Sequence, residues 1–176
     1  SAWGGAVTEA FAFRQLPSLQ IVLRPKVSKL RVRASQMMVI GAQRDQLSSE
    51  MTIRGDVSEQ FTLSFLLSKG WTIREVRSLR GVPVRQTWMG QATKTHQILF
   101  VEFKRPVMRG QKLLIQAERW SDQTLRVFPT LVPSRVHELR GTLAIAAPVD
   151  YELQTEALKS LKTRERYGLR PVGLRL

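Results

Sequence analysis

Apolar and polar residues alternate along the middle of the chain. Every second residue is apolar in the run that contains Phe61, Leu63 and Phe65. A period of two places these side chains on one face of an extended strand and the polar residues on the other. The run stops at 68–70, where Gly70 tolerates the positive φ of a tight turn. The stretch 59–120 therefore predicts the centre of a β domain, around which the rest of the chain is organised.

Runs of similar length recur on both sides of this stretch. We expect strands at 10–14, 19–23, 29–34, 36–41, 46–53, 61–67, 71–76, 86–89, 97–103, 112–117, 124–128, 138–146 and 151–154. Short strands at this spacing, separated by Gly and Pro, are typical of sandwiches and barrels. Helix is expected only at 155–166, where Leu158 and Leu161 lie three residues apart and Thr155 can cap the first turn. The predicted fold class is all-β: an antiparallel two-sheet β-sandwich, immunoglobulin-like or saddle-like, with at most one short helix near the C-terminus.

The phasing of these strands predicts which side chains form the core. Nine apolar residues should lie mostly inside, and the phasing is wrong if fewer than half of them are buried: Phe61, Leu63, Phe65, Ile73, Val76, Ile98, Phe100, Leu113 and Ile115. Trp71 and Trp120 stand at strand ends, so we expect both in the core or at its edge.

Length and composition suit one domain with extensions. The chain has 176 residues, 43% of them hydrophobic, and no cysteine, which excludes disulfides and thiolate metal sites. It has no apolar run of the 18 residues that a transmembrane helix needs. We assign 1–9 to a leader, 10–154 to the β-sandwich domain and 155–176 to a C-terminal extension. Because 166–176 repeats the order of aromatic, basic, proline and apolar residues at 11–23, the extension could begin a next module of a tandem array.

The chain is strongly basic, with a formal net charge of +14 that is divided evenly between its two halves. A nucleic-acid binder usually gathers its charge in one patch, so this spread disfavours nucleic acid. The densest run supplies our candidate polyanion-binding residues, which are Arg24, Lys26, Arg31 and Arg33. On a strand, the last two form a basic face opposite an apolar one. That face is either a solvated surface or a surface for phosphates, acidic polysaccharide or anionic lipid.

Trp88 is a candidate stacking residue. It follows Arg85 in a segment flanked by Gly and Pro. An exposed indole near an arginine can stack on sugars or bases, while burial in the core is the alternative interpretation.

The chain shows no pattern of catalytic residues. Its two histidines, His96 and His137, have no spacing that brings them together with a carboxylate to ligate zinc. It contains neither the Gly-x-Ser-x-Gly elbow of hydrolases nor a glycine-rich phosphate loop. We therefore predict that the protein is not an enzyme, and we predict no catalytic residue, metal site or cofactor.

Several of these segments together carry a family resemblance. They are the Gly-Trp strand at 70–76, the strand at 98–103, Gly110 with the strand at 112–117, and the strand at 139–146. In order and character they resemble modules of very large cell-envelope proteins of planctomycete-type bacteria. More distantly, they resemble the β-rich N-terminal saddle of zinc aminopeptidases. The first resemblance implies β-sandwich modules outside the cytoplasm with a scaffolding or adhesive role. The second implies a fold only, since the histidine and glutamate zinc motif of that family is absent.

Three functions follow as expectations. The first is a non-enzymatic structural or interaction module of a larger extracytoplasmic bacterial protein, in the periplasm or at the cell surface. Its partners would be neighbouring modules of the same protein or other cell-envelope proteins. The second is a module that binds a polyanion or carbohydrate, such as an anionic glycan or surface. The third is a non-catalytic β domain of a larger enzyme such as an aminopeptidase.

Overall fold

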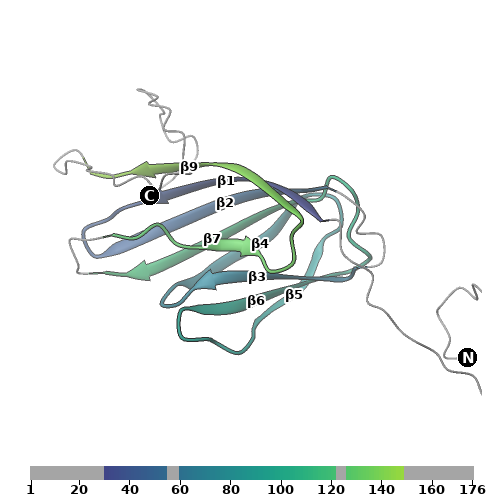
Figure 1. The fold of residues 1–176 in the computed structure, drawn as a ribbon, viewed down its shortest axis with the longest axis horizontal. Helices are drawn as coiled ribbons and strands as arrows, with labels where there is room; N and C mark the ends of the chain where they lie inside the picture. Colours follow the sequence, from purple (N-terminus) through teal and green to yellow (C-terminus); the bar gives the residue numbers. More distant parts are fainter. Residues whose placement is uncertain (1–29, 55–59, 122–125, 149–176) are drawn as a thin grey trace, which may run out of the picture.

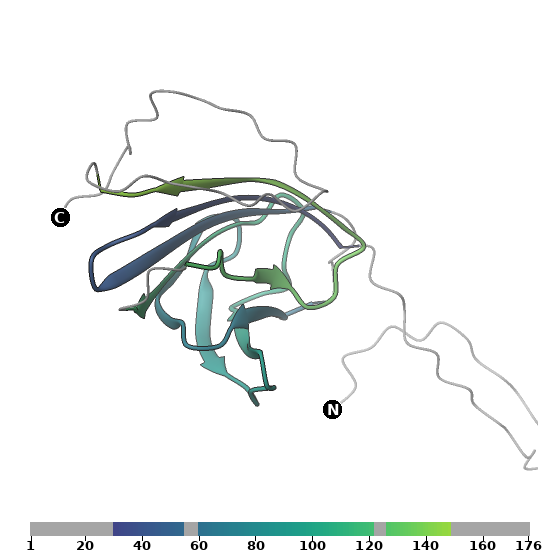
Figure 2. The same cartoon turned by 60° about the vertical axis from the view of Figure 1, so that its left-hand side comes forward.

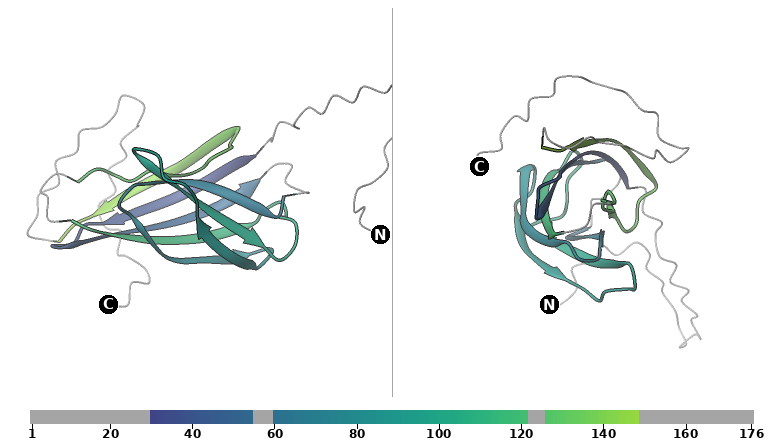
Figure 3. Two further views of the ribbon diagram at one scale, coloured as in Figure 1. Left: turned by 90° about the horizontal axis from the view of Figure 1, so that it is seen from below. Right: turned by 90° about the vertical axis from the view of Figure 1, so that its left-hand side faces the viewer.

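A computed structural model describes residues 30–54, 60–121 and 126–148, which form two β-sheets packed face to face (Figures 1 and 3). The first sheet has five strands in the order β4 (Thr72–Arg80), β7 (Lys112–Trp120), β2 (Arg44–Arg54), β1 (Arg31–Val39) and β9 (Glu138–Ala146). The second has four strands in the order β5 (Val84–Met89), β6 (His96–Phe103), β3 (Thr62–Ser68) and β8 (Leu131–Pro133). The predicted all-β two-sheet sandwich is confirmed.

The chain moves repeatedly from one sheet to the other. Only the β1–β2 and β5–β6 connections join neighbours within a sheet, and each of the other connections crosses between the sheets. All strand pairs are antiparallel except β1 and β9, which run parallel at the edge of the five-stranded sheet (Figures 1 and 2). Pairing of strands far apart in the sequence therefore holds the fold together. No helix in the described ranges is long and apolar enough to cross a membrane.

The core lies between the sheets and follows the period of two. Every second side chain of β2 is buried, from Asp45 to Ile53, while the residues between them reach solvent. The same alternation holds in β3, where Leu63, Phe65 and Leu67 are buried. In β7, Leu113 and Ile115 are fully buried. One face of each of these strands is thus fixed by the need to remove apolar surface from water.

The predicted phasing is wrong in β6. Its fully buried residues are Leu99, Val101 and Phe103, whereas Ile98 and Phe100 lie half-buried on the outer face. Every residue of the segment 98–103 is apolar except Glu102, which lies on the outer face with Ile98 and Phe100, so this single polar residue is the one local signal of the orientation. The orientation of β6 is set by pairing with β3, where buried Phe65 lies opposite Leu99.

Fewer than half of the nine expected core residues are fully buried. Leu63, Phe65, Leu113 and Ile115 are, and Ile73 and Val76 of β4 pack against the core while partly exposed. Phe61 precedes β3 and is 51% exposed. By that criterion the phasing failed overall, although it is correct for β3 and β7.

The two tryptophans expected near the core behave differently. Trp71 is buried, with the Arg119 guanidinium 5.1 Å from its ring centroid. Trp120 is 65% exposed, which contradicts the expectation, and it stacks with Arg44 at 4.3 Å. Trp120 ends β7 on the outer face, because it lies opposite Arg44 rather than inward-facing Asp45.

Several strands, such as β4 and β7, extend beyond their expected bounds, and two of the strand predictions within the described ranges are wrong. The strands expected at 29–34 and 36–41 are one continuous strand, β1. Residues 126–130 form no strand, and the short strand β8 follows them instead. The leader, the strands at 10–14, 19–23 and 151–154, and the helix at 155–166 lie outside the described residues.

A charged cluster is buried at one end of the sandwich. The side chain of Asp45 is completely buried and accepts a hydrogen bond from Arg119 at 2.9 Å and another from Arg126 at 3.2 Å. Arg126 also donates to the carbonyl oxygen of Ser121. A buried carboxylate needs such partners, since an unpaired charge in the interior is very costly.

A buried glutamine fixes the turn between β4 and β5. The Gln111 side chain accepts a hydrogen bond from the Val82 amide at 2.7 Å and donates to the Val82 carbonyl and to Ser78. Gly81, with φ of 100°, leaves room for this amide, because a Cβ there would lie 2.3 Å from the Gln111 Oε1 atom. All of the polar groups of this buried side chain are therefore satisfied.

Candidate interaction surfaces

The outer face of the four-stranded sheet is apolar at its centre. Residues directly opposite each other on paired strands share one face of a sheet. Trp88 lies opposite Phe100, and Ile98 lies opposite Leu66, which in turn lies opposite Val132 on β8. We call these five residues the apolar face. Trp88 is 41% exposed and the other four are half-buried, so the apolar face crosses all four strands on the solvent side.

Its most prominent feature is an aromatic pair. The Trp88 and Phe100 rings are stacked, with centroids 5.3 Å apart and planes inclined by 13°. Gly90 makes room for this pair, because a Cβ there would lie 2.6 Å from the Phe100 ring. Trp88, the candidate stacking residue in the sequence, is exposed, and the Phe100 ring packs against one face of its indole.

Polar side chains surround the apolar face. Glu102 accepts hydrogen bonds from Gln86 and Arg85 on the edge strand β5. On the other side, the hydroxyl of Ser64 on β3 contacts that of Ser134, the residue after β8. An apolar centre within a polar rim is the usual composition of a protein–protein interface.

The outer face of the five-stranded sheet is charged instead. Glu118 pairs with Arg44 at 3.3 Å and with Arg74. The hydrogen bond from Arg74 holds the pKa of Glu118 below its usual value, against the opposing effect of partial burial. Because these charged side chains pair with one another, this part of the face is stable in contact with water and needs no binding partner.

One end of this charged face is basic. Arg33 lies between Arg140 on β9 and Thr52 on β2, and Thr52 lies opposite Lys112. Lys112 in turn lies opposite Arg80 on β4. With the neighbouring pair on β1 and β2, this row forms what we call the basic band: Arg31, Arg33, Arg54, Arg80, Lys112 and Arg140.

The basic band spans the sheet. It crosses five strands, or about 19 Å at the usual spacing between strands. Within the described ranges, the carboxylates that pair with it are Glu138, with Arg31 at 3.5 Å and Arg140, and Glu50, with Lys112 at 3.1 Å. Six basic residues that are distant from one another in the sequence are thus gathered on one face of the sheet.

The structure separates the candidate site residues. Arg31 and Arg33 lie on the five-stranded sheet and Trp88 lies on the four-stranded sheet, so they do not form one site. Arg24 and Lys26 lie outside the described residues. Sequence analysis did not identify Arg54, Arg80, Lys112 and Arg140 as band residues, since only strand pairing brings them together.

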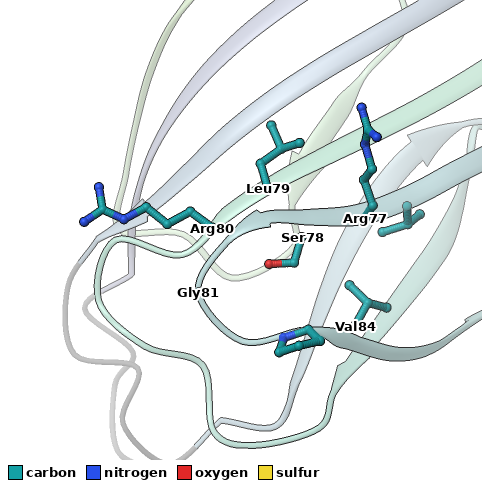
Figure 4. Close-up of a pocket in the computed structure, with 8 residues that line it drawn as sticks. Arg77, Ser78, Leu79, Arg80, Gly81 and Val84 are labelled. Atoms are coloured by element: carbon teal, nitrogen blue, oxygen red, sulfur yellow. The ribbon is translucent and has the colours of Figure 1, made fainter.

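A shallow hollow lies between the edge strands β4 and β5. It has a volume of about 440 Å³ and is lined by Val76, Arg77, Ser78, Leu79, Arg80, Gly81, Pro83 and Val84. Figure 4 shows the side chains of Arg77 and Arg80 extending away from the turn in different directions. The lining thus offers no converging set of polar groups.

No group of histidine, aspartate and glutamate able to hold a metal ion occurs in the part of the chain that the structure describes. The His96 Nδ1 atom hydrogen-bonds to the hydroxyl of the neighbouring Thr95. The backbone amide of His137, just before β9, donates to the carbonyl oxygen of Leu30, just before β1. The two histidines thus occupy unrelated surroundings.

No protein-family model and no curated protein matches this sequence. Among solved structures, a non-cellulosomal cohesin from Archaeoglobus fulgidus is 14% identical, with a TM-score of 0.39, over 68% of this chain and 92% of that one. An exo β-N-acetylglucosaminidase from Vibrio harveyi is 12% identical, with a TM-score of 0.32. It matches over 74% of this chain, which spans 20% of the enzyme's length. Sequence identities and TM-scores this low do not assign the chain to a family.

Proposed function

We propose that this protein is a non-catalytic β-sandwich module that binds another protein through the apolar face. The observation that carries the proposal is the exposed row of apolar side chains across the four-stranded sheet, centred on Trp88 and Phe100. A strand face turned to solvent usually carries polar residues, as the other sheet does. Contiguous apolar surface with a polar rim is costly in water and is typical of binding surfaces.

Trp88 is the expected anchor of this interface. Tryptophan is enriched among the few residues that contribute most of the energy of binding, and such residues lie near the centre of the contact. The stacked Phe100 ring holds the indole in one orientation, which lowers the entropy lost on binding. Gln86 and Glu102 lie beside it. The Gln86 amide can donate a hydrogen bond to a polar group of the partner, and the Glu102 carboxylate can accept one.

Photo-crosslinking tests the proposal. A photoreactive phenylalanine analogue replaces Ile98 on the apolar face or, in the control, exposed Gln46 on the other sheet. In an extract of the source cells, only the Ile98 variant should capture a protein. The captured protein is then purified, and Trp88→Ala should weaken its affinity at least tenfold, whereas Gln46→Ala should leave it unchanged. Equal capture from both positions, or an affinity insensitive to Trp88→Ala, would contradict the proposal.

The basic band supports a second candidate function, the binding of an anionic polymer such as an acidic polysaccharide. Six cationic side chains on five neighbouring strands present a linear array of charge. Arginine favours such contacts because its planar guanidinium pairs with carboxylate, sulfate or phosphate in two hydrogen bonds.

Titration with heparin and with a neutral glycan at low and high salt tests this candidate. Binding through the band should be selective for heparin and should fall along a steep log–log salt slope. Arg33→Gln with Arg54→Gln should weaken it, and Trp88→Ala should not. Weak binding to every polyanion that vanishes at physiological salt would mean that the band is only a solvated surface.

The setting of the module is also a proposal: a larger bacterial protein outside the cytoplasm. It is supported by the resemblance to cell-envelope modules. Protease treatment of intact source cells should digest the module if it is at the cell surface. A zinc or hydrolase motif encoded downstream in the same gene would instead favour the domain of an enzyme.

A further inference from the structure

The four edges of the two sheets are protected to different degrees. An unpaired strand edge invites pairing with another chain, and proteins usually blunt it with bulges, proline, lysine or short length. β4 has two register shifts, β5 has one, and β8 has only three residues. β9 has nine residues, contains neither proline nor lysine, and pairs with β1 without a shift. Among the described strands, β9 thus presents the most regular free edge (Figures 1 and 2).

The free edge of β9 offers a defined set of backbone groups. The Glu138 amide donates to the Leu30 carbonyl at 3.3 Å, and the Ala146 carbonyl accepts from the Ile40 amide at 2.8 Å. The even-numbered residues of β9 therefore direct their backbone groups toward β1. Since successive residues of a strand point to opposite sides, the odd-numbered residues direct theirs away from it. These are Leu139, Gly141, Leu143 and Ile145, and no other described strand pairs with them.

The same residues place apolar side chains on the core side of the sheet. Leu139, Leu143 and Ile145 are 41%, 49% and 39% exposed, although their partners on β1 in the same register are buried. The three side chains therefore face the core side but extend beyond the cover of the second sheet. We call them the β9 stripe. The free edge thus combines unpaired backbone groups with apolar surface.

We propose that two copies of this protein associate by antiparallel pairing of β9 with β9, about a twofold axis at Thr142, so that their five-stranded sheets form one continuous sheet. A twofold interface must be complementary to itself. In this register Leu139 faces Ile145 of the second copy, and Leu143 faces Gly141 of the second copy. All nine residues of β9 are paired, and the free backbone groups of the two edges meet one another.

The β9 stripe selects this register. Because Gly141 has no side chain, it leaves space beside the Leu143 side chain of the second copy. A shift of two residues would place either Ile145 opposite His137 or Leu139 opposite Ala147. Both of these facing residues lie outside β9. Only the register centred on Thr142 therefore pairs every residue of the β9 stripe with a residue of the same strand.

The charge of β9 also favours a second copy. Its two charged residues, Glu138 and Arg140, form an ion pair with each other. In the proposed register Glu138 faces Ala146 and Arg140 faces Ala144, so like charges do not face each other. The two Arg140 residues lie about 14 Å apart along the strands, which exceeds the Debye length of about 8 Å at physiological ionic strength. Two copies of a chain with a net charge of +14 can therefore meet at this edge.

Disulfide trapping in the full chain tests the pairing, since the natural sequence has no cysteine. Thr142→Cys should form a disulfide-linked dimer under mild oxidation, because facing residues of this type lie about 4.5 Å apart, within the range that a disulfide spans. The matched control, Ala144→Cys, should form at least tenfold less. A mixture of Arg140→Cys and Ala144→Cys should give the mixed dimer. Efficient linkage of Ala144→Cys alone, or none of Thr142→Cys, would overturn the proposal.

Sedimentation of the unmodified chain over a range of micromolar concentrations tests the dimer without cysteines. Leu143→Pro removes an amide that points to the free edge and leaves the amides bonded to β1 in place. It should weaken association at least tenfold, and hydrogen exchange of the β1 amides should show that the β1–β9 pair persists. Trp88→Ala, on the other sheet, should leave association unchanged.

Three results would show another occupant or none. A monomer at every concentration with freely exchanging β9 amides would mean that the edge stays open. A monomer whose odd-numbered β9 amides are protected would mean that another part of the chain covers it. A dimer that Trp88→Ala weakens and Leu143→Pro does not would place the second copy on the apolar face. Each of these results overturns the proposal, and the first two leave the function proposed for the apolar face untouched.

Discussion

Trp88 lies flat against Phe100, with ring centroids 5.3 Å apart, on the outside of the sandwich and not in its core. The pair joins the edge strand β5 to its neighbour β6. Two large aromatic rings in this position contribute little to the core, so their loss should affect binding more than folding. This difference distinguishes an interface residue from a structural one.

Trp88→Ala should therefore cost only about 1–2 kcal/mol of unfolding free energy, since a stacked pair contributes roughly 0.5–1.5 kcal/mol beyond the area it buries. The matched core variant, Phe65→Ala, removes a completely buried ring and should cost about 3–5 kcal/mol. Urea unfolding of both variants measures the two values. Equal losses would show that Trp88 serves the fold.

Asp45→Asn should destabilise the protein by about 3–5 kcal/mol, because it leaves Arg119 and Arg126 without their buried carboxylate. The control is Glu50→Gln, which removes an exposed pair with Lys112 and should cost less than about 1 kcal/mol. Both values come from urea unfolding at neutral pH. A small loss for Asp45→Asn would mean that the two arginines find other partners.

Gln111→Leu tests the turn between β4 and β5. It keeps the volume of the buried side chain but leaves the Val82 amide and carbonyl without their partner. We expect a loss of about 2–4 kcal/mol, since each unsatisfied buried group costs roughly 1–3 kcal/mol. Gln46→Leu, at an exposed position of β2, is the control and should be nearly neutral. Thermal unfolding gives the comparison.

Gly141→Ala tests the close approach of β9 to β1. A Cβ at this position would lie 2.1 Å from the carbonyl oxygen of Ala34, so β9 must move away from its neighbour. The expected cost is about 1–3 kcal/mol, with faster hydrogen exchange along the β1–β9 pair. Thr142→Ala, at the next exposed position, should change neither quantity greatly. Unchanged exchange in Gly141→Ala would show that β9 tolerates the extra atom.

Glu118 should make the stability depend on acid pH. Its pKa is lowered in the folded protein, chiefly by the hydrogen bond from Arg74. The stabilisation is therefore fully present above the unfolded pKa, near 4.3 for glutamate, and is lost as the pH falls through the lower folded value. Glu118→Gln should flatten this part of the profile of unfolding free energy against pH. A profile identical to that of the unmodified protein would contradict the role of this pair.

The sequence by itself determined the class of the fold and the inner faces of its clearest strands. In β2, polar residues separate the apolar ones, and in β3 and β7 most residues of the outer face are polar, so only one orientation buries most of the apolar set. The inward face of each of these strands could be predicted without knowing which strands it pairs with, because the alternation is a property of the strand's own sequence.

Only the tertiary structure determined which residues form the apolar face and the basic band. The run at Ile98–Phe103 carries apolar residues on both sides, with Glu102 as its only polar residue, and pairing with β3 sets which of them lie in the core and which join the apolar face. Likewise, Arg33 and Arg140 are distant in the sequence and meet because β9 returns parallel to β1. Burial of apolar side chains selects the faces of single strands, but strand order arises from long-range backbone pairing, which no local pattern encodes.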